Sequence, residues 1–265
     1  MLRIDGRPVP RLYVEADLGP GRSVPLIEAR RHYLTRVMRL AQGDRVVLFN
    51  GRDGEWLARL DATAASLESV LRAQTREPDI WLLFTALKKE RLRFLVEKAS
   101  ELGVAVLVPV LTEFTGGPDV RPDKVLEWAR EAAEQCGRLS VPVCDKPRPL
   151  ESVLAGWDEG RCLILADETG TGQPAMDVFR RGAHAPAALL VGPEGGLSAR
   201  ERERALAVPV SVSIGLGPRI LRSETAALVA LAYWQAAQGD GRAGPVLIDA
   251  KDASIRTGPA LKDIK

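Results

Sequence analysis

The sequence has little of what several classes of protein need. Its 265 residues include only three cysteines and two histidines, and the cysteines (Cys136, Cys144 and Cys162) lack the spacing of metal ligands. We therefore expect reduced thiols packed as small apolar side chains, with neither a disulfide framework nor a metal site. No apolar run approaches membrane-spanning length, and the N-terminus lacks the apolar core of a signal peptide. These absences favour a soluble protein of the cytoplasm.

A strong charge of one sign is also missing. The 37 basic and 35 acidic residues leave a formal net charge of +2, so any nucleic-acid surface must be a local patch. The Gly-Lys-Ser/Thr of a P-loop is absent, and so is the glycine spacing of a dinucleotide fingerprint. A phosphate cradle is therefore a weak interpretation of any glycine-rich turn in this chain.

The first 74 residues are predicted to form a small β-rich domain. Glycine-bearing turns separate short apolar or alternating runs, and one helix is expected around residues 32–40. The polar segment 74–79 holds a proline, which favours a domain boundary there. The expected strands cover residues 12–14, 46–49, 56–60 and 69–71.

Residues 75–238 are predicted to form an α/β domain. Continuous apolar runs alternate with helical patterns, which indicates a parallel sheet covered by helices on both faces. Residues 239–265 lack periodicity, and we expect a disordered tail there. The expected strands cover residues 80–87, 104–111, 162–166, 187–191 and 210–216. In the helix that opens at Pro122, the residues predicted to face inward are Leu126, Ala129, Ala133 and Cys136.

Two glycine-punctuated turns carry most of the functional information. Residues 192–198 read Gly-Pro-Glu-Gly-Gly-Leu-Ser, and residues 214–226 read Ile-Gly-Leu-Gly-Pro-Arg-Ile-Leu-Arg-Ser-Glu-Thr-Ala. Each turn follows an apolar run and leads into a helical pattern, and Ser198 with Glu201 forms a capping box. Two such strand-to-helix corners predict one ligand pocket at the carboxyl edge of a parallel sheet.

The residue types in these corners favour a particular kind of ligand. Glycine lets the backbone approach a ligand closely, which suits a flat purine and a ribose. Arg219 and Arg222 stand beside this bare backbone and suit a carboxylate or an RNA phosphate. Taken singly, the glycines would equally turn a tight corner, and each arginine would be an ordinary surface residue. Two corners in succession before one final helix favour a functional site.

These two motifs closely resemble the RsmE family of knotted SPOUT methyltransferases, which methylate N3 of uridine 1498 in 16S ribosomal RNA. Further matches are residues 32–34 (His-Tyr-Leu), 37–39 (Val-Met-Arg), 98–104 (Lys-Ala-Ser-Glu-Leu-Gly-Val) and 134–138 (Glu-Gln-Cys-Gly-Arg). The resemblance spans residues 10–238. It implies a C-terminal α/β domain with a deep trefoil knot and a mostly parallel sheet, preceded by a PUA-like RNA-binding β-barrel over residues 1–74.

The resemblance also implies the ligands and partners. The cofactor would be S-adenosylmethionine, the partner 16S rRNA of the small ribosomal subunit, and the assembly a homodimer with each site near the subunit interface. In the family the cofactor is bent and held by the backbone of the two corners. The positions that match the family's cofactor contacts are Leu165, Gly192, Pro193, Glu194, Gly195, Leu216, Gly217, Ile220, Leu221, Arg222 and Thr225.

Uridine N3–H is a weakly acidic imide, which must lose its proton as the methyl group is transferred. We rank positioning and cationic stabilisation, by Arg138 and Arg222, above proton removal by a single base. Glu194 is the candidate base, although carboxylates in such turns more often bind backbone amides. Neither His32 nor His184 is expected to act as the base.

A basic run in the first domain is predicted to contact RNA. It combines arginines with the neighbouring aromatic Tyr33, as single-stranded RNA sites do, and a second basic pair follows the first strand of the α/β domain. Phe114 stands where the family often has arginine, which removes one expected cation from the RNA side. The predicted RNA-contacting residues are Arg30, Arg31, Arg36, Arg39, Lys88 and Lys89.

Three alternatives remain open at this point. The chain could be a SPOUT methyltransferase for another RNA, such as a tRNA ribose. It could be a non-catalytic RNA-binding or assembly factor that keeps the fold. It could also be an unrelated nucleotide-binding α/β enzyme, in which case it would bind ATP and not S-adenosylmethionine.

Overall fold

The computed structural model describes residues 3–4, 7–116, 120–181, 186–241, 246–248 and 255–257. The chain forms two compact units. Unit 1 comprises Met1–Arg76, Ala133–Val141 and Ala243–Lys265, and unit 2 comprises Glu77–Ala132 and Pro142–Arg242. The sequence places residues 133–141 inside the second predicted domain, so their membership of unit 1 is a finding of the structure.

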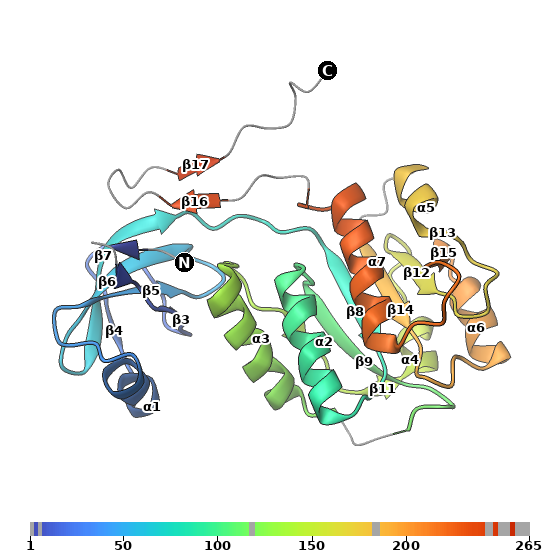
Figure 1. The fold of residues 1–265 in the computed structure, drawn as a ribbon, viewed down its shortest axis with the longest axis horizontal. Coiled ribbons are helices and arrows are strands. Elements are labelled where there is room, and N and C mark those ends of the chain that lie inside the picture. Colours follow the sequence, from blue (N-terminus) through green and yellow to red (C-terminus); the bar gives the residue numbers. More distant parts are fainter. Residues whose placement is uncertain are drawn as a thin grey trace. The chain divides into compact units, whose positions relative to one another are not determined.

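Unit 1 is built on a five-stranded sheet with the order β3-β5-β6-β7-β4 (Figure 1). All neighbours pair antiparallel except β3 and β5, which are parallel. The sequence predicted four of these strands, and it missed β4 because Val24 is the only buried residue in it. The strands are β3 (Arg11–Tyr13), β4 (Ser23–Pro25), β5 (Arg45–Phe49), β6 (Glu55–Leu60) and β7 (Ala64–Arg72), and a separate pair is formed by β1 (Arg3–Ile4) and β2 (Arg7–Pro8).

The helix of unit 1 is shifted from its predicted place. It begins as α1 (Glu28–His32) and continues as a π-helical turn (Tyr33–Val37), in which the Met38 N–H donates to the Tyr33 carbonyl. Arg39 then adopts a positive φ of 56°, which ends the helix. Leu34 is the one buried side chain of the π-helical turn and joins the core of the sheet. The prediction of residues 32–40 therefore started too late and ended too late.

Unit 2 contains the predicted parallel sheet, in the order β10-β9-β8-β14-β12-β15-β13 with β11 paired to β9. Every pairing is parallel. β12 and β14 have the predicted bounds, whereas β8 ends three residues earlier than expected, and the short edge strands were not predicted. The strands are β8 (Ile80–Phe84), β9 (Val106–Leu111), β10 (Val143–Cys144), β11 (Arg148–Pro149), β12 (Cys162–Ala166), β13 (Gln173–Pro174), β14 (Ala187–Val191) and β15 (Ser211–Gly215).

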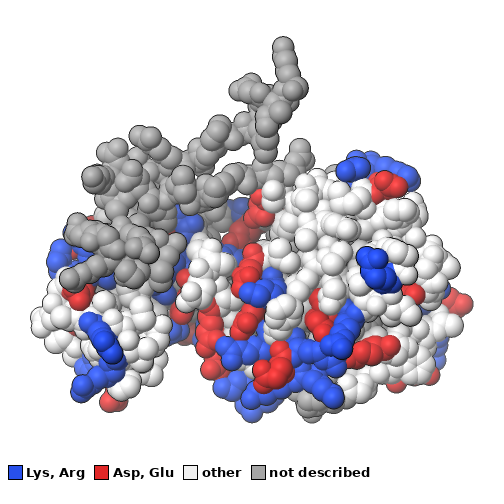
Figure 2. Space-filling model, in the orientation of Figure 1, with Lys and Arg blue, Asp and Glu red and all other residues white. Residues whose placement is uncertain are grey.

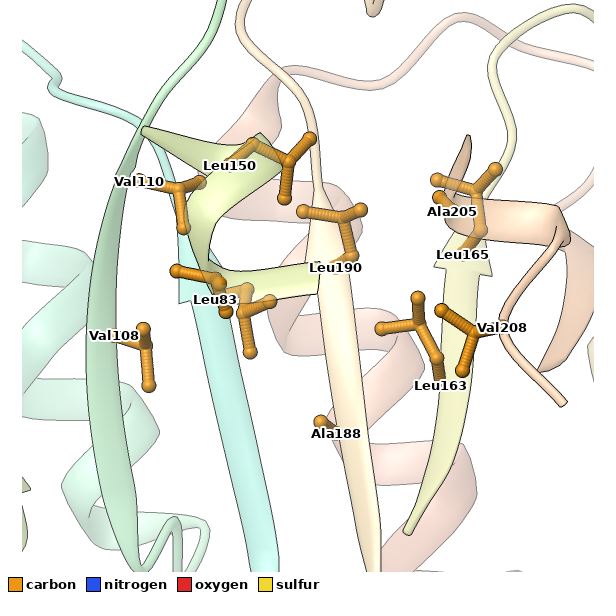
Figure 3. Packing of buried hydrophobic residues seen from close by; sticks show 11 residues of the cluster. Leu83, Val108, Val110, Leu150, Leu163, Leu165, Ala188, Leu190, Ala205 and Val208 are labelled. Atoms are coloured by element: carbon orange, nitrogen blue, oxygen red, sulfur yellow. The ribbon is translucent and has the colours of Figure 1, made fainter. Parts of the chain in front are cut away.

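Helices cover both faces of this sheet, because the central strands are apolar on both sides. On one face α7 packs beside α2 and α5. On the other face α4 and α6 cover a core that includes Leu163 and Leu165 of β12 and Leu190 of β14, with Ala205 and Val208 packed beside Leu163 and Leu165 (Figure 3). The helices are α2 (Lys89–Glu101), α3 (Pro122–Cys136), α4 (Leu150–Ala155), α5 (Ala175–Arg181), α6 (Ala199–Leu206) and α7 (Ser223–Ala237).

The buried face of α3 differs from the predicted one. Trp128 and Ala129 are buried, but Leu126 is only half-buried and Cys136 is exposed. Cys144 is half-buried and Cys162 is buried, and none of the three cysteines forms a disulfide within the part of the chain that the structure describes. The expectation that all three thiols pack as core side chains was wrong for Cys136.

The segment beyond residue 238 contains a short hairpin that the sequence did not predict. Val246–Ile248 (β16) pairs antiparallel with Ile255–Thr257 (β17), and both strands hold β-branched residues. Elsewhere in the described ranges, no helix is both long and apolar enough to cross a membrane. Those same ranges contain no cluster of His, Cys, Asp and Glu that could hold a metal ion.

A buried carboxylate ties unit 1 together. Glu55 is 1% exposed and lies between Arg72, whose Nε and Nη2 donate at 2.7 and 2.8 Å, and the Arg11 guanidinium. The same two arginines donate to backbone carbonyls around the C-terminus of α3: Arg11 to those of Ala133 and Arg138, and Arg72 to that of Gly137. The last carbonyls of a helix lack partners within the helix, so this network explains why residues 133–141 belong to unit 1.

We predict that Glu55→Gln lowers the free energy of unfolding by about 3 kcal/mol at pH 7, because it leaves two largely covered arginines, each with a side chain 12% exposed, without their counter-charge. Burial raises the pKa of Glu55, but the hydrogen bonds and charges of Arg72 and Arg11 outweigh it, so the pKa lies below its usual value. Because the pKa of Glu55 is lower in the folded than in the unfolded state, the ionised carboxylate stabilises the fold at any pH above the unfolded-state pKa. This stabilisation is lost as the pH falls through the folded-state pKa. Urea titrations at several pH values should therefore show that the difference in unfolding free energy between the wild type and Glu55→Gln shrinks under acidic conditions.

Glu68→Gln is the matched control, because Glu68 also pairs with two arginines of unit 1, Arg45 and Arg59, but at the surface. The Glu68→Gln substitution should lower the free energy of unfolding by no more than about 1 kcal/mol. Equal losses for the two variants would contradict the role given to Glu55.

Candidate functional site

A cavity of about 620 Å³ opens at the carboxyl ends of β12, β14 and β15. Its walls come from the three loops that follow these strands, residues 167–172, 192–198 and 216–222, together with residues of α5 and α7. Parallel strands bring their carboxyl ends to one edge, so the three loops converge although they are far apart in sequence. A cavity of this size fits a small organic ligand.

The two predicted corners line this one cavity and are bonded to each other. The Ser223 hydroxyl, at the start of α7, donates to the Gly192 carbonyl at 2.8 Å. The predicted capping box is present, since the Ser198 hydroxyl accepts from the Glu201 N–H and the Glu201 carboxylate accepts from Ser198. The predicted cofactor residues that line the cavity are Gly192, Pro193, Leu216, Gly217, Ile220 and Leu221.

The other predicted cofactor residues lie around the cavity. Leu165 is 2% exposed and belongs to the core behind it. Gly195 packs against Phe114, with 3.2 Å between the Phe114 Cβ and the place that a Gly195 Cβ would occupy. Arg222 is the exposed residue that precedes α7, and Thr225 is exposed in its first turn. Their contacts with a cofactor stay predictions.

Sequence reasoning missed the third loop. Residues 167–172 read Asp-Glu-Thr-Gly-Thr-Gly and follow the buried strand β12, which is the same signal that identified the other two corners. Gly172 has no room for a side chain, because a Cβ there would lie 2.4 Å from the Ile214 carbonyl carbon. The cavity-lining residues that were not predicted include Glu168, Thr169, Gly170, Gly172, Pro174, Ala175, Met176 and Tyr233.

Glu168 connects the third loop to the first corner. Its Oε1 accepts a hydrogen bond from the Leu197 N–H at 3.2 Å. The same oxygen lies 2.4 Å from where a Cβ of Gly196 would be, and Gly196 has a positive φ of 75°. Glycine is therefore favoured at 196 by its backbone conformation, and a side chain there would have to displace the Glu168 carboxylate.

Charged residues gather beside the cavity, at the start of α2. The Glu194 carboxylate accepts from Arg91 at 2.7 Å, and the buried Glu224 lies 3.7 Å from the same guanidinium. Glu194 thus binds an arginine, whereas a turn carboxylate was expected to bind backbone amides. Lys88 and Lys89 are exposed. Figure 2 shows Lys and Arg side chains concentrated along the lower edge of unit 2, where β8 and β9 end in Figure 1.

Family models match most of the chain. A model of an RNA methyltransferase domain matches residues 74–235, and a model of an RNA methyltransferase PUA domain matches residues 26–67. The chain belongs to this RNA methyltransferase family. The first match covers unit 2 with its cavity, and the second lies within the β-rich unit 1.

Individual relatives agree with the family models. The ribosomal RNA small subunit methyltransferase E of Synechocystis is 32% identical over 221 residues, which are 79% of this chain and 72% of the relative. The protein of the same name from Rickettsia conorii is 28% identical over 84% of this chain and 93% of its own length. The crystal structure of that methyltransferase from Neisseria gonorrhoeae, bound to S-adenosyl methionine, is 28% identical with a TM-score of 0.76, covering 88% of this chain and 99% of that one. The predicted fold class, an α/β domain with a mostly parallel sheet after a small PUA-like β-rich domain, is confirmed.

The remaining predicted site residues of this methyltransferase family member lie mainly in unit 1. Arg31, Arg36 and Arg39 are exposed, and His32 is exposed among them. Arg30 is half-buried and pairs with Glu134 at 3.1 Å. Arg138 is half-buried in the segment held by Arg11 and Arg72, and its contribution to catalysis stays a prediction. His184 lies outside the described residues.

We predict that Gly172→Ala lowers the free energy of unfolding by about 2 kcal/mol, because the added methyl group must displace the backbone at Ile214. Chemical denaturation followed by circular dichroism measures the loss. Gly116→Ala is the control, since a Cβ at Gly116 meets no atom of the described residues within 4 Å. A Gly172→Ala variant as stable as the control would show that the loop can move away from β15.

Proposed function

We propose that this chain uses S-adenosylmethionine to methylate N3 of uridine 1498 in the 16S rRNA of the small ribosomal subunit. The observation that carries the proposal is the cavity formed by three glycine-bearing loops at the carboxyl edge of the unit 2 sheet. Membership of the RNA methyltransferase family supports the reaction class. The names of the relatives support the small subunit as substrate.

The cavity suits this cofactor. Adenosine could be held without a phosphate loop. The exposed backbone of Gly192 and Gly217 would form hydrogen bonds with it, and the apolar side chains of Leu216 and Leu221 would contact it. The related structure from Neisseria gonorrhoeae was determined with S-adenosyl methionine bound. When bound, the cofactor supplies a methyl group already activated by its positively charged sulfur.

The protein's own contribution to catalysis is then positioning and charge. The N3–H of uridine lies on its Watson–Crick edge, so the target base must be unpaired or flipped out to reach the cavity. As N3 loses its proton, negative charge spreads to the flanking carbonyl oxygens. Arg222, beside the cavity, and Arg138 are the cations that we assign to this charge. The Glu194 carboxylate, which binds Arg91, ranks below them as a direct participant.

The exposed cations would bind the RNA backbone. Lys88 and Lys89 stand at the N-terminus of α2, where the free amide groups of the helix add a partial positive charge. Among the described residues, neither lysine has an ion pair of its own, so both are available to phosphates. In unit 1, Arg31, Arg36 and Arg39 lie near the half-exposed Tyr33, which suits single-stranded RNA. A protein that acts on ribosomal subunits would work in the cytoplasm.

The decisive experiment incubates the purified protein with methyl-labelled S-adenosylmethionine and small ribosomal subunits from a strain that lacks this modification. Mass spectrometry of the nucleosides should find N3-methyluridine. Label in another nucleoside would indicate a methyltransferase for another RNA site. Cofactor binding without any methyl transfer would favour a non-catalytic RNA-binding factor. Binding of ATP without binding of S-adenosylmethionine would favour an unrelated nucleotide-binding enzyme.

We predict that Arg138→Ala lowers the single-turnover rate of methyl transfer by about 100-fold, the usual effect of removing one donor to a developing oxyanion. Arg121→Ala is the control, because Arg121 is exposed and pairs only with the nearby Asp123 among the described residues. A wild-type rate for Arg138→Ala would remove this residue from the mechanism. Mixing Arg138→Ala with an inactive Arg222→Ala variant should restore activity if Arg138 acts on the partner's site, since a mixed dimer then has one intact site.

We propose a homodimer that uses the outward face of α7. This helix is apolar nearly throughout, and its exposed positions include Ala232, Tyr233 and Ala236. The cavity-lining Ile220, just before α7, is 92% exposed. Figure 2 shows few charged side chains over this part of unit 2. An apolar helical face of this kind suits a twofold contact between identical surfaces.

Ala232→Arg should convert the dimer to monomers, because it places two charges in a twofold apolar contact. Sedimentation equilibrium measures the mass. Ala207→Arg, at an exposed position after α6, should leave the dimer intact. A dimer that persists in Ala232→Arg would rule out this face.

A further inference from the structure

A fully buried carboxylate lies directly beneath the third loop of the cavity. Asp167 follows the last residue of β12, and its side chain has no exposed surface. The Arg202 guanidinium, from α6, donates to its Oδ2 at 2.6 Å. A buried charge is costly unless it is paired and hydrogen-bonded, so the position of this carboxylate needs an explanation.

Both oxygens of Asp167 are saturated by donors from the loop and its neighbours. Oδ1 accepts from the Thr169 N–H at 2.9 Å and from the Thr169 hydroxyl at 2.7 Å. Oδ2 accepts from the hydroxyls of Thr171 at 2.9 Å and of Ser213 at 2.8 Å, besides Arg202. A carboxylate has about four lone-pair sites, so these five donors leave no capacity for a ligand.

These bonds fix the course of residues 168–172. The loop turns around the carboxylate through Thr169 and Thr171, while Ser213 ties the same carboxylate to β15. From this fixed loop, Glu168 reaches the Leu197 N–H of the first corner. The cavity wall is thus connected through Asp167 to β15 and α6, and through Glu168 to the first corner.

We propose that Asp167 is a positioning residue for the cofactor cavity: its carboxylate holds the 168–172 loop in the shape that binds the cofactor. Burial raises the pKa of Asp167, but hydrogen bonds from Thr169, Ser213 and Thr171 outweigh it and hold the pKa well below the usual range, so the group is charged at neutral pH. The inference rests on the proposed function, because S-adenosylmethionine is the ligand in its test.

The other end of the same sheet offers a matched pair. Asp79, just before β8, receives two hydrogen bonds from Arg161, at 3.0 and 2.8 Å. Arg161 is buried and also stacks on Trp81, whereas Asp79 is half-exposed. This aspartate–arginine pair lies at the amino edge of the sheet, away from the cavity loops, so its loss affects stability without touching the cofactor site.

The test compares Asp167→Asn with Asp79→Asn, and adds Ser213→Ala as a milder variant that removes one neutral hydrogen bond. Calorimetry gives the Kd for S-adenosylmethionine, steady-state kinetics on small subunits give kcat and KM, and hydrogen exchange of the ligand-free proteins reports on the amides of Thr169 and Leu197. We expect Asp167→Asn to raise Kd and KM for the cofactor about tenfold, with kcat at saturation within about twofold, as the loss of a charged hydrogen bond predicts. Hydrogen exchange at both amides should be faster in Asp167→Asn than in the wild type. Ser213→Ala should change Kd, KM and exchange in the same direction by a smaller amount.

Asp79→Asn should leave Kd, KM and the exchange rates of these two amides unchanged, even if it lowers thermal stability as much as Asp167→Asn does. An unchanged Kd in both Asp167→Asn and Ser213→Ala, or an equal rise of Kd in Asp79→Asn, would overturn the proposal. Wild-type protein that binds no S-adenosylmethionine would refute the proposed function and with it the cofactor role of the loop. The exchange data would then still decide whether Asp167 holds the loop.

Discussion

The parallel strand order β8-β14-β12-β15 is the constraint on which the rest of unit 2 depends. Parallel strands end at one edge, so each crossover must return over a face of the sheet through a helix and leave its first loop at that edge. Four strands in register thereby bring together loops from residues 85, 167, 192 and 216 onward. The cavity is a consequence of this topology, and its chemistry is set by what the loops contain.

The contacts that shape these loops are made mainly by backbone and small residues. Gly172 touches the end of β15, Gly196 gives passage to the Glu168 carboxylate, and the Ser223 hydroxyl binds the Gly192 carbonyl. Each contact needs a residue that is small or has a short hydroxyl. A methyl donor that is already activated makes few demands beyond placement, so a site of fixed backbone is consistent with the proposed reaction.

The sequence predicted the central strands and both corners, because buried parallel strands are continuous apolar runs and glycines mark the turns after them. It missed β10, β11 and β13, which hold two residues each and carry no period. The third loop was missed because its acidic and hydroxyl residues are typical of any surface turn, and only the structure reveals that Asp167 is buried. The assignment of residues 133–141 to unit 1 depends on Arg11 and Arg72, whose bonds to distant carbonyls leave no local pattern.

Each unit therefore relies on a buried carboxylate whose partners come from distant parts of the chain. Glu55 draws Arg11 and Arg72 to the end of α3, and Asp167 draws Arg202 of α6 and Ser213 of β15 to one loop. A well-packed apolar core would supply similar stability, but it would not dictate which carbonyl or which hydroxyl lies where. A methyltransferase must hold its cofactor and the target nucleobase in one fixed geometry. Directional bonds to the buried carboxylates of Glu55 and Asp167 fix the backbone at two places where the sequence pattern alone does not specify its course.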